Sequence, residues 1–253
     1  MTVLFLVPDI HDLQTGGNVF NRRMAEALRP ETPVRVVSWN PTEAPGADIS
    51  GADVIVADSL LAQHPDALLV VREANPTASL VLLVHYLHCV DPHASDSEAA
   101  ADERATLATV DAAIAPSRFV RQALLDEDLP ADRISVVRPG LDGRYRGALP
   151  VRLRQEAPRM LTVANLLPGK ELRSFVDVLS EVRAVPWRWI LVGDASLDPE
   201  YAAGVFRRLR AARLTDRMTW TGSVSPPALR TWYDRADLFV LPSRFETCSL
   251  STR

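Results

Sequence analysis

The residue in this sequence best suited to chemistry is a lysine that follows a short apolar stretch. Residues 160–164 predict a buried strand, Pro168 and Gly169 predict a turn, and apolar residues at helical spacing follow. Lys170 ends the turn and is the single lysine of the sequence, because every other positively charged side chain is arginine. A compact ammonium at a helix start suits phosphate as a point charge. We therefore predict phosphate binding; the alternative is a solvated lysine in a helix's first turn.

A carboxylate occupies a comparable place near the end of the sequence. Residues 238–241 predict an apolar strand that runs into a Pro-Ser loop and then Glu246. In α/β sheets, ligands bind at the carboxyl ends of parallel strands. Glu246 is therefore expected near the loop of Lys170, where it would hydrogen-bond a polyhydroxylated ligand.

Three other strand ends carry candidate residues. Gly193 and Asp194 close an apolar strand, where the glycine would permit close approach of a ligand and the aspartate would orient a loop or a sugar hydroxyl. Gly16 and Gly17 follow the first strand, and a tight turn explains them as well as ligand contact does. His85 follows another strand and is a candidate for chemistry, with a structural histidine as the alternative.

Metal and disulfide chemistry are not indicated. His88, Cys89 and His93 lie close to His85, but one cysteine without a second ligand pair does not make a structural zinc site. No metal is expected at the ligand site either. Cys89 and Cys248 are far apart in the sequence, so we expect no disulfide framework and a cytoplasmic location.

The amino-acid composition argues against some classes of protein. The sequence has 253 residues, 47% of them hydrophobic and 24% charged, with a net charge of −4. These values describe an ordinary globular protein and exclude a general nucleic-acid-binding role. A cluster of four arginines between residues 207 and 213 is expected to be a solvated helix face. No apolar run approaches the ~20 residues that span a bilayer, and the start of the sequence does not resemble a signal peptide.

Alternating strand and helix patterns predict two α/β domains with parallel sheets. Strands are expected at residues 3–7, 34–39, 54–57, 79–84, 112–115 and 134–137, and then at 160–164, 189–192, 218–221 and 238–241. The first helix is expected after Gly17, with Asn18 as its N-cap and with Phe20, Met24, Ala27 and Leu28 on one face. Further helices are expected at residues 60–73, 95–109, 116–125, 170–183, 199–212 and 225–235. We draw the domains at 1–143 and 158–253, joined by a linker at 144–157. The linker lies in a stretch, residues 138–158, that is rich in Arg, Pro and Gly and has no sustained period.

Several short motifs occur together in a fixed order. The second domain contains Ala164-Asn165 followed by Lys170, Val192-Gly193-Asp194, Trp220-Thr221-Gly222 and Leu241-Pro242-Ser243-Arg244-Phe245-Glu246. The first contains Gly16-Gly17, the strand-end His85, Ala115-Pro116-Ser117 and Arg138-Pro139-Gly140-Leu141-Asp142. In this order, across nearly the whole sequence, they resemble the retaining GT-B glycosyltransferases of family 4. The resemblance implies two Rossmann-like doubly wound domains, of which the first serves the acceptor and the second binds the nucleotide sugar.

The resemblance also assigns roles to individual residues. Lys170 would bind the donor diphosphate, Glu246 would hold hydroxyls of the transferred sugar, and His85 would lie near the reacting sugar, so His85 and Glu246 are the candidate catalytic residues. The implied substrate-binding residues are Gly16, Gly17, Asn165, Lys170, Gly193, Asp194, Ser243, Thr247, Cys248, Ser249 and Leu250.

Three departures from the family pattern affect these expectations. Asn165 replaces an arginine and offers phosphate only neutral hydrogen bonds, which are weaker than charge-assisted ones. Residues 247–250 bear side chains where the family has a small, glycine-bearing stretch. The family's second glutamate would fall just beyond Arg253. By resemblance, the second domain is then incomplete and the sequence is the front part of a longer enzyme.

The implied activity is transfer of a sugar from a nucleotide diphosphate sugar to an acceptor hydroxyl, with retention and without a metal or other cofactor. The acceptor (a sugar, a lipid or a small molecule) is open, and so is peripheral contact with a membrane. One alternative is a non-catalytic sugar-nucleotide or protein-binding module, favoured by Asn165. Another is a GT-B sugar-nucleotide epimerase.

Overall fold

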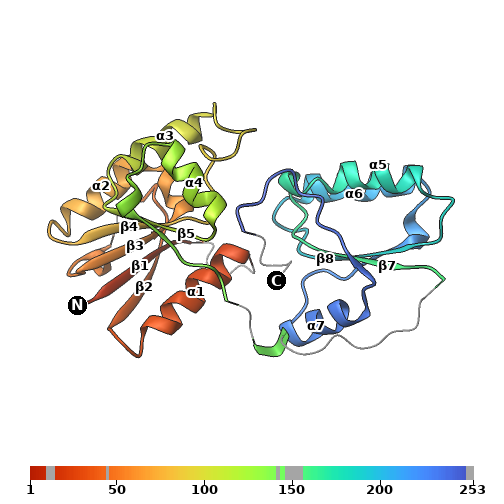
Figure 1. Cartoon of the computed structure of the whole chain (residues 1–253), viewed down its shortest axis with the longest axis horizontal. Helices are drawn as coiled ribbons and strands as arrows, with labels where there is room; N and C mark the ends of the chain where they lie inside the picture. Colours follow the sequence, from red (N-terminus) through yellow and green to blue (C-terminus); the bar gives the residue numbers. More distant parts are fainter. Residues whose placement is uncertain (10–14, 44–45, 141–142, 146–155, 249–253) are drawn as a thin grey trace. The chain divides into compact units, whose positions relative to one another are not determined.

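The computed structural model describes residues 1–9, 15–43, 46–140, 143–145 and 156–248. The chain divides into two compact units, Met1–Pro139 (unit 1) and Gly140–Arg253 (unit 2). Figure 1 shows each unit as a sheet with helices packed on both of its faces. Most of the expected linker, residues 146–155, lies outside the described residues.

Within its described residues, unit 1 contains a six-stranded parallel sheet in the order β2-β1-β3-β4-β5-β6. Its elements are β1 (Val3–Pro8), α1 (Gly16–Leu28), β2 (Val34–Trp39), β3 (Val54–Asp58), α2 (Pro65–Glu73), β4 (Ser79–Leu83), α3 (Glu98–Leu107), β5 (Ala112–Ala115), α4 (Arg118–Asp126) and β6 (Ile134–Val136). The expected strands of this unit are therefore confirmed.

The central strand β1 is buried along its whole length, as its unbroken apolar sequence predicts. The chain runs from β1 to β2 in one direction and from β3 through β6 in the other. Since parallel crossovers are right-handed as a rule, the helices are expected on opposite faces. Figure 1 shows α1 on one face and α2, α3 and α4 on the other. Phe20 of α1 and Phe5 of β1 belong to the same hydrophobic cluster. The strand order reverses between β1 and β3, which places the polar strand ends of unit 1 at a switch point.

The expected start of the first helix is wrong. Helix α1 begins at Gly16, and its N-cap is Thr15, whose hydroxyl accepts a hydrogen bond from the Asn18 amide at 3.1 Å. Asn18 lies inside the helix and is buried. A threonine outside the helix can satisfy an amide of the first turn, whereas Asn18 follows two glycines that are themselves helical. The buried alanine of α1 is Ala25, because the expected Ala27 is exposed.

The helix expected at residues 60–73 is divided in two. Ser59–Gln63 form a 3-10 helix, and α2 starts afresh at Pro65. Proline lacks the amide hydrogen that a continuous helix needs, but it fits the first turn of a new one. The break keeps Ser59 directly after the end of β3, where it contributes to the polar cluster described below.

Within its described residues, unit 2 contains a four-stranded parallel sheet in the order β10-β7-β8-β9. Its elements are β7 (Arg159–Val163), α5 (Leu172–Glu181), β8 (Arg188–Val192), α6 (Pro199–Ala211), β9 (Met218–Trp220), α7 (Pro226–Arg235) and β10 (Leu238–Phe239). The strands again agree with those expected, except that β10 ends earlier; beyond it, the Val240 amide still donates to Leu161 O at 2.9 Å.

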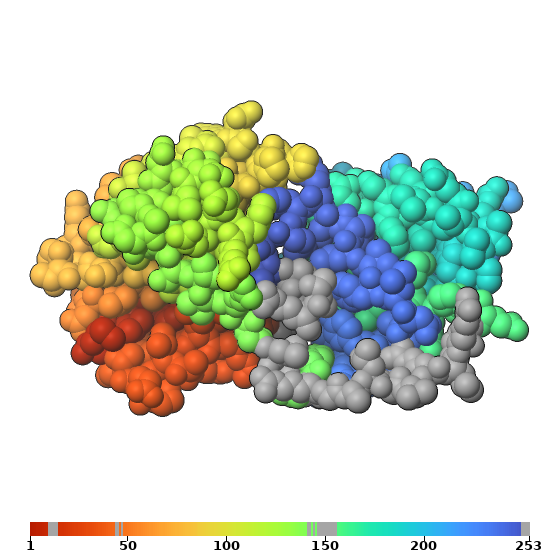
Figure 2. Space-filling view, in the orientation of Figure 1, coloured from red at the N-terminus to blue at the C-terminus, as the bar shows by residue number. Residues whose placement is uncertain are grey.

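Alternate side chains of β8 serve the two faces of this sheet. Trp189 and Leu191 pack beneath α5 and α6, whereas Ile190 and Val192 pack against α7. The outer face of α5 is at the surface in Figure 2, where it appears in cyan, and its Val178 is 53% exposed. The helix expected from Lys170 begins only at Leu172, because Glu171 adopts a left-handed conformation (φ 49°) that interrupts it.

Candidate functional site

The two predicted ligand-binding residues of unit 2 meet at its switch point. Strand β7 lies between β8 and β10, and the connections after β7 and β10 leave their strands at the same edge of the sheet. Lys170 Nζ donates to Glu246 Oε1 at 2.6 Å, and the side chains are 31% and 28% exposed. The structure thus brings together an ammonium and a carboxylate, partly open to solvent, where α/β sheets commonly bind ligands.

The backbone around Lys170 fixes its position. Pro168–Lys170 form a 3-10 turn, closed by the Lys170 amide donating to Leu167 O at 3.0 Å. The Arg244 amide donates to Gly169 O at 3.1 Å, so the segment after β10 is tied directly to this turn. Lys170 therefore stands at the end of a 3-10 turn and not in the first turn of an α-helix. The strain of the following left-handed residue is of a kind common near binding sites.

Asn165 and Asp194 hold the neighbouring loops together. The Asp194 amide donates to Asn165 Oδ1 at 3.0 Å, and the Leu166 amide donates to Asp194 O at 2.8 Å. The pKa of Asp194 lies below its ordinary value, chiefly because the Ser196 amide donates to its carboxylate at 2.7 Å. Asp194 thus orients its own loop, one of the two roles expected for it.

Gly193 is required by a close approach within the chain itself. A Cβ at this position would lie 1.9 Å from the carbonyl oxygen of Ala164. The expectation that Gly193 makes room for a ligand is therefore not needed to explain the glycine. Ligand contacts of Gly193, Asn165 and Asp194 stay predictions.

The segment after β10 carries the remaining predicted residues of unit 2. Ser243 Oγ is buried and has no hydrogen-bond partner in the described part of the chain. An unsatisfied buried hydroxyl costs about 1–3 kcal/mol, which a ligand that bonds it would recover. Thr247 and Cys248 are half-buried. Ser249 and Leu250 lie outside the described residues.

In unit 1, His85 belongs to a polar cluster at the carboxyl edge of the sheet. Its Nε2 lies 2.7 Å from Asn21 Oδ1 and 3.5 Å from Asp58 Oδ2. Asn21 Nδ2 donates to the same Asp58 oxygen at 2.5 Å, and the His85 amide donates to Ser59 Oγ at 2.9 Å. Because Asn21 presents its oxygen to the imidazole, the neutral His85 carries its proton on Nε2.

Burial sets the charge of this imidazole. Removal from solvent lowers the pKa of His85 below its ordinary value, and the nearby Asp58 carboxylate opposes that change only in part. We therefore take His85 as neutral. Gly17 is constrained by the ring, because a Cβ there would lie 3.0 Å from His85 Cδ2. Gly16 and Gly17 form the first turn of α1, so the turn and the histidine are packed as one assembly.

Sequence reasoning did not find Asn21 and Asp58. Asp58 could have been noticed as the polar last residue of an apolar strand, at the edge where ligands bind. Asn21 lies one helical turn after Gly17, and therefore on the same face of α1. Neither signal indicates the contact with His85, which spans 64 positions of the sequence.

The same described segments also bear on metal binding and on membrane insertion. They contain no group of three or more His, Cys, Asp or Glu side chains that could hold a metal ion. None of their helices combines the length and apolar character that crossing a bilayer requires. His88 and His93, considered above for zinc, instead contact Glu103 and Asp91.

Comparison with known proteins supports a particular fold. Residues 157–252 match the family described as Glycosyl transferases group 1. Anabaena HepE, solved with UDP and glucose, aligns at 18% identity over 98% of this chain and 76% of its own, with a TM-score of 0.66. No curated protein matches the chain.

Two further solved structures agree. Sucrose-phosphate synthase from Thermosynechococcus elongatus aligns at 15% identity over 99% of this chain and 77% of its own, with a TM-score of 0.76. The lipopolysaccharide outer core galactosyltransferase WaaB aligns at 15% identity over 99% and 76%, with a TM-score of 0.64. The two parallel-sheet units have the GT-B fold of these glycosyltransferase structures, as the sequence predicted.

Proposed function

We propose that the protein is a glycosyltransferase that takes a sugar from a nucleotide diphosphate sugar and passes it to an acceptor hydroxyl with retention. The observation that carries the proposal is the Lys170–Glu246 pair at the switch point of unit 2, inside the segment that matches Glycosyl transferases group 1. The likeness to HepE, which was solved in complex with UDP-glucose, favours a uridine nucleotide as the first donor to try.

In this proposal Lys170 is the main charge for the diphosphate. The leaving diphosphate gains negative charge as its bond to the sugar breaks, and a fixed ammonium stabilises that charge best in the transition state. Backbone amides near Thr247, Ser249 and Leu250 would add hydrogen bonds, as the family resemblance implies. Asn165 would contribute a neutral hydrogen bond only, so Lys170 carries more of the binding than it would beside an arginine.

Glu246 would bind hydroxyl groups of the transferred sugar. A carboxylate accepts hydrogen bonds from two hydroxyls at once, and the ion pair with Lys170 holds the Glu246 side chain in place while no donor is bound. With retention, the acceptor would attack from the side that the diphosphate leaves. The neutral His85 would contact the sugar from unit 1. The positive charge for the diphosphate comes from Lys170, so we propose a reaction that does not depend on a metal.

Only two cysteines occur in the 253 residues, Cys89 and Cys248, which fits a reducing compartment, and we propose that the protein lies in the cytoplasm.

The alternative function is a sugar-nucleotide-binding module without transferase activity, which Asn165 favours because it removes a charge from the phosphate site. Calorimetry with UDP and UDP-glucose, followed by NMR of the sugar products, separates the candidates. Transfer to an added sugar, with or without EDTA, supports the proposal. Binding of UDP-glucose without turnover supports the module, and a new epimer of the nucleotide sugar supports an epimerase. If neither UDP nor UDP-glucose binds, both the transferase and the binding module are refuted, because each requires a nucleotide at Lys170.

A further inference from the structure

Two buried carboxylates lie behind a short loop of unit 1 that the proposed function has not used. The loop follows β4 and leads to α3, and Figure 2 shows this segment, in yellow, at the surface of unit 1. Glu103 on α3 is fully buried, and Asp91 in the loop is 3% exposed. Each carboxylate supports a side chain that is itself partly open to solvent.

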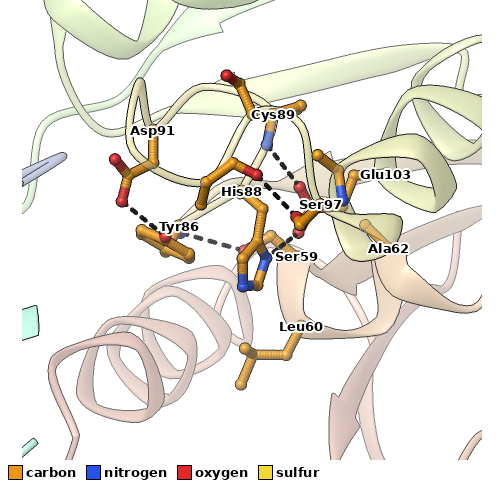
Figure 3. Close-up of polar contacts among 12 residues, drawn as sticks. Ser59, Leu60, Ala62, Tyr86, His88, Cys89, Asp91, Ser97 and Glu103 are labelled. Atoms are coloured by element: carbon orange, nitrogen blue, oxygen red, sulfur yellow. Dashed lines mark hydrogen bonds and ion pairs between the residues drawn. The ribbon is translucent and has the colours of Figure 1, made fainter. Parts of the chain in front are cut away.

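Glu103 orients His88. The carboxylate lies 2.9 Å from His88 Nδ1 through one oxygen and accepts from the Cys89 amide at 2.9 Å through the other (Figure 3). A carboxylate can only accept, so Nδ1 carries a proton, and the neutral imidazole then has its lone pair on Nε2. The His88 side chain is 29% exposed. The same environment raises the pKa of the Cys89 thiol to about 12, first through burial and then through Glu103.

Asp91 orients Tyr86 in the same manner. The Tyr86 hydroxyl donates to Asp91 Oδ2 at 2.8 Å, and the His93 amide donates to the other oxygen at 2.9 Å (Figure 3). The rings of Tyr86 and His88 meet edge to face, with centroids 5.1 Å apart and planes at 80°. An imidazole and a phenol are therefore fixed side by side, each by a carboxylate at its back.

Holding a loop alone does not require this arrangement. Burial of a carboxylate costs several kcal/mol unless hydrogen bonds and charges compensate it. The cation nearest to Glu103 in sequence, Arg104, does not serve it, because its guanidinium pairs with Glu127 at 2.6 Å. Apolar side chains at these two positions would pack the loop without that cost. We therefore attribute the two buried carboxylates to a need to hold the exposed imidazole and phenol in one orientation.

We propose that His88 and Tyr86 form the acceptor subsite of the transferase, and that the acceptor is an uncharged sugar. This inference rests on the proposed function for the reaction, but the binding surface belongs to unit 1 and does not involve Lys170. The Nε2 lone pair of His88 accepts a hydrogen bond from a sugar hydroxyl. The ring of Tyr86 offers an apolar surface to the C–H groups of the sugar.

The local charge defines the class of acceptor. From His85 through Glu103 the sequence contains no Lys or Arg and five carboxylates, namely Asp91, Asp96, Glu98, Asp102 and Glu103. The next residue, Arg104, donates to the Ser95 carbonyl oxygen at 2.9 Å and is already paired with Glu127. Such a segment repels a phosphorylated sugar, whose charge it cannot neutralise. An uncharged hydroxyl, in contrast, donates to Nε2 without any need for a cation. The surface therefore discriminates against sugar phosphates.

Histidine-detected ¹⁵N NMR of the full chain tests the binding directly. Methyl α-glucoside is the neutral probe and glucose 6-phosphate the charged one, each titrated with and without saturating UDP. We expect methyl α-glucoside to shift the Nε2 resonance of His88, and we expect glucose 6-phosphate to bind at least tenfold more weakly. His88→Gln should weaken the glucoside about tenfold, as loss of a good hydrogen bond does. His93→Gln on the same loop is the matched control and should bind normally.

Glu103→Gln tests the role of the buried carboxylate. If Glu103 orients the ring, this variant loses the strong preference for a proton on His88 Nδ1, which the ¹⁵N shifts report, and also loses sugar affinity. Equal glucoside affinity in wild type and His88→Gln, or tighter binding of glucose 6-phosphate than of the glucoside, would overturn the proposal. UDP affinity, measured by calorimetry on the same samples, reports on the donor site separately. Failure of UDP to bind counts against the proposed function, whereas failure of the glucoside counts against this subsite.

Discussion

The ion pair between Lys170 and Glu246 leads us to predict that a second substitution restores part of the UDP affinity lost in a first. Lys170→Ala removes the ammonium proposed to bind the donor diphosphate and also leaves the Glu246 carboxylate without its partner at 2.6 Å. Affinity for UDP should therefore fall for two reasons. Adding Glu246→Gln to this variant removes the unpaired carboxylate, so the double variant should bind UDP more tightly than Lys170→Ala alone.

The size of each effect follows from the geometry. A charge-assisted hydrogen bond to phosphate contributes about 1.5–3 kcal/mol. Opening the existing ion pair, whose partners are 31% and 28% exposed, offsets up to about 1 kcal/mol of this. The uncompensated carboxylate of the single variant repels a phosphate charge roughly 5 Å away by about 1 kcal/mol in a water-like medium. Lys170→Ala should thus lose about 2–3 kcal/mol, or 30- to 150-fold in affinity, and the double variant should recover about fivefold.

Calorimetric titration of UDP and UDP-glucose into the four proteins of this cycle measures the effect. Arg183→Ala, at an exposed position after α5, controls for the loss of one positive charge from unit 2. Glu246→Gln alone should bind UDP up to about fivefold more tightly than the wild type, because no ion pair has to open. It should also abolish any extra affinity for UDP-glucose. Unchanged UDP affinity in Lys170→Ala, or a double variant that binds no better than that single variant, would refute the reasoning.

Three further predictions concern stability and reactivity. Burial lowers the folded-state pKa of His85 below the ordinary 6.5, so the unfolded state takes up a proton first and the free energy of unfolding should fall as pH drops below about 6.5. His85→Gln should make this fall less steep in urea titrations at several pH values. An equal dependence on pH in the variant and the wild type would contradict the prediction. Gly193→Ala, with a Cβ 1.9 Å from Ala164 O, should destabilise unit 2 by about 3 kcal/mol or more, whereas Gly169→Ala, which has nothing within 4 Å, should cost under about 1 kcal/mol. Cys89, with its pKa raised to about 12, should resist alkylation at pH 8 in the folded protein; rapid labelling of Cys89 would show that the thiol is not so buried.

The sequence alone determined the alternation of strands and helices and the positions of Lys170 and Glu246 after two strands. Apolar runs bounded by turns are local signals, and parallel strand ends share an edge, so Lys170 and Glu246 could be expected to approach each other from their positions after two strands. The same alternation predicted two domains with parallel sheets, and the family resemblance implied the GT-B fold. The first residue of α1 could not be predicted from the sequence, because Gly16 and Gly17 allow many backbone conformations. The N-cap is therefore Thr15 and not the expected Asn18.

Only the tertiary structure decided which side chains act together. His85, Asn21 and Asp58 come from three separate elements, and no spacing in the sequence relates them. The same holds for Glu103 and His88, since a mostly solvated helix pattern gives no sign that one of its carboxylates is fully buried. Nor does the sequence indicate that the Ala164 backbone occupies the space where a side chain at position 193 would lie. Periodicity and turn chemistry act over a few residues, whereas burial and hydrogen-bond geometry are settled when distant segments pack.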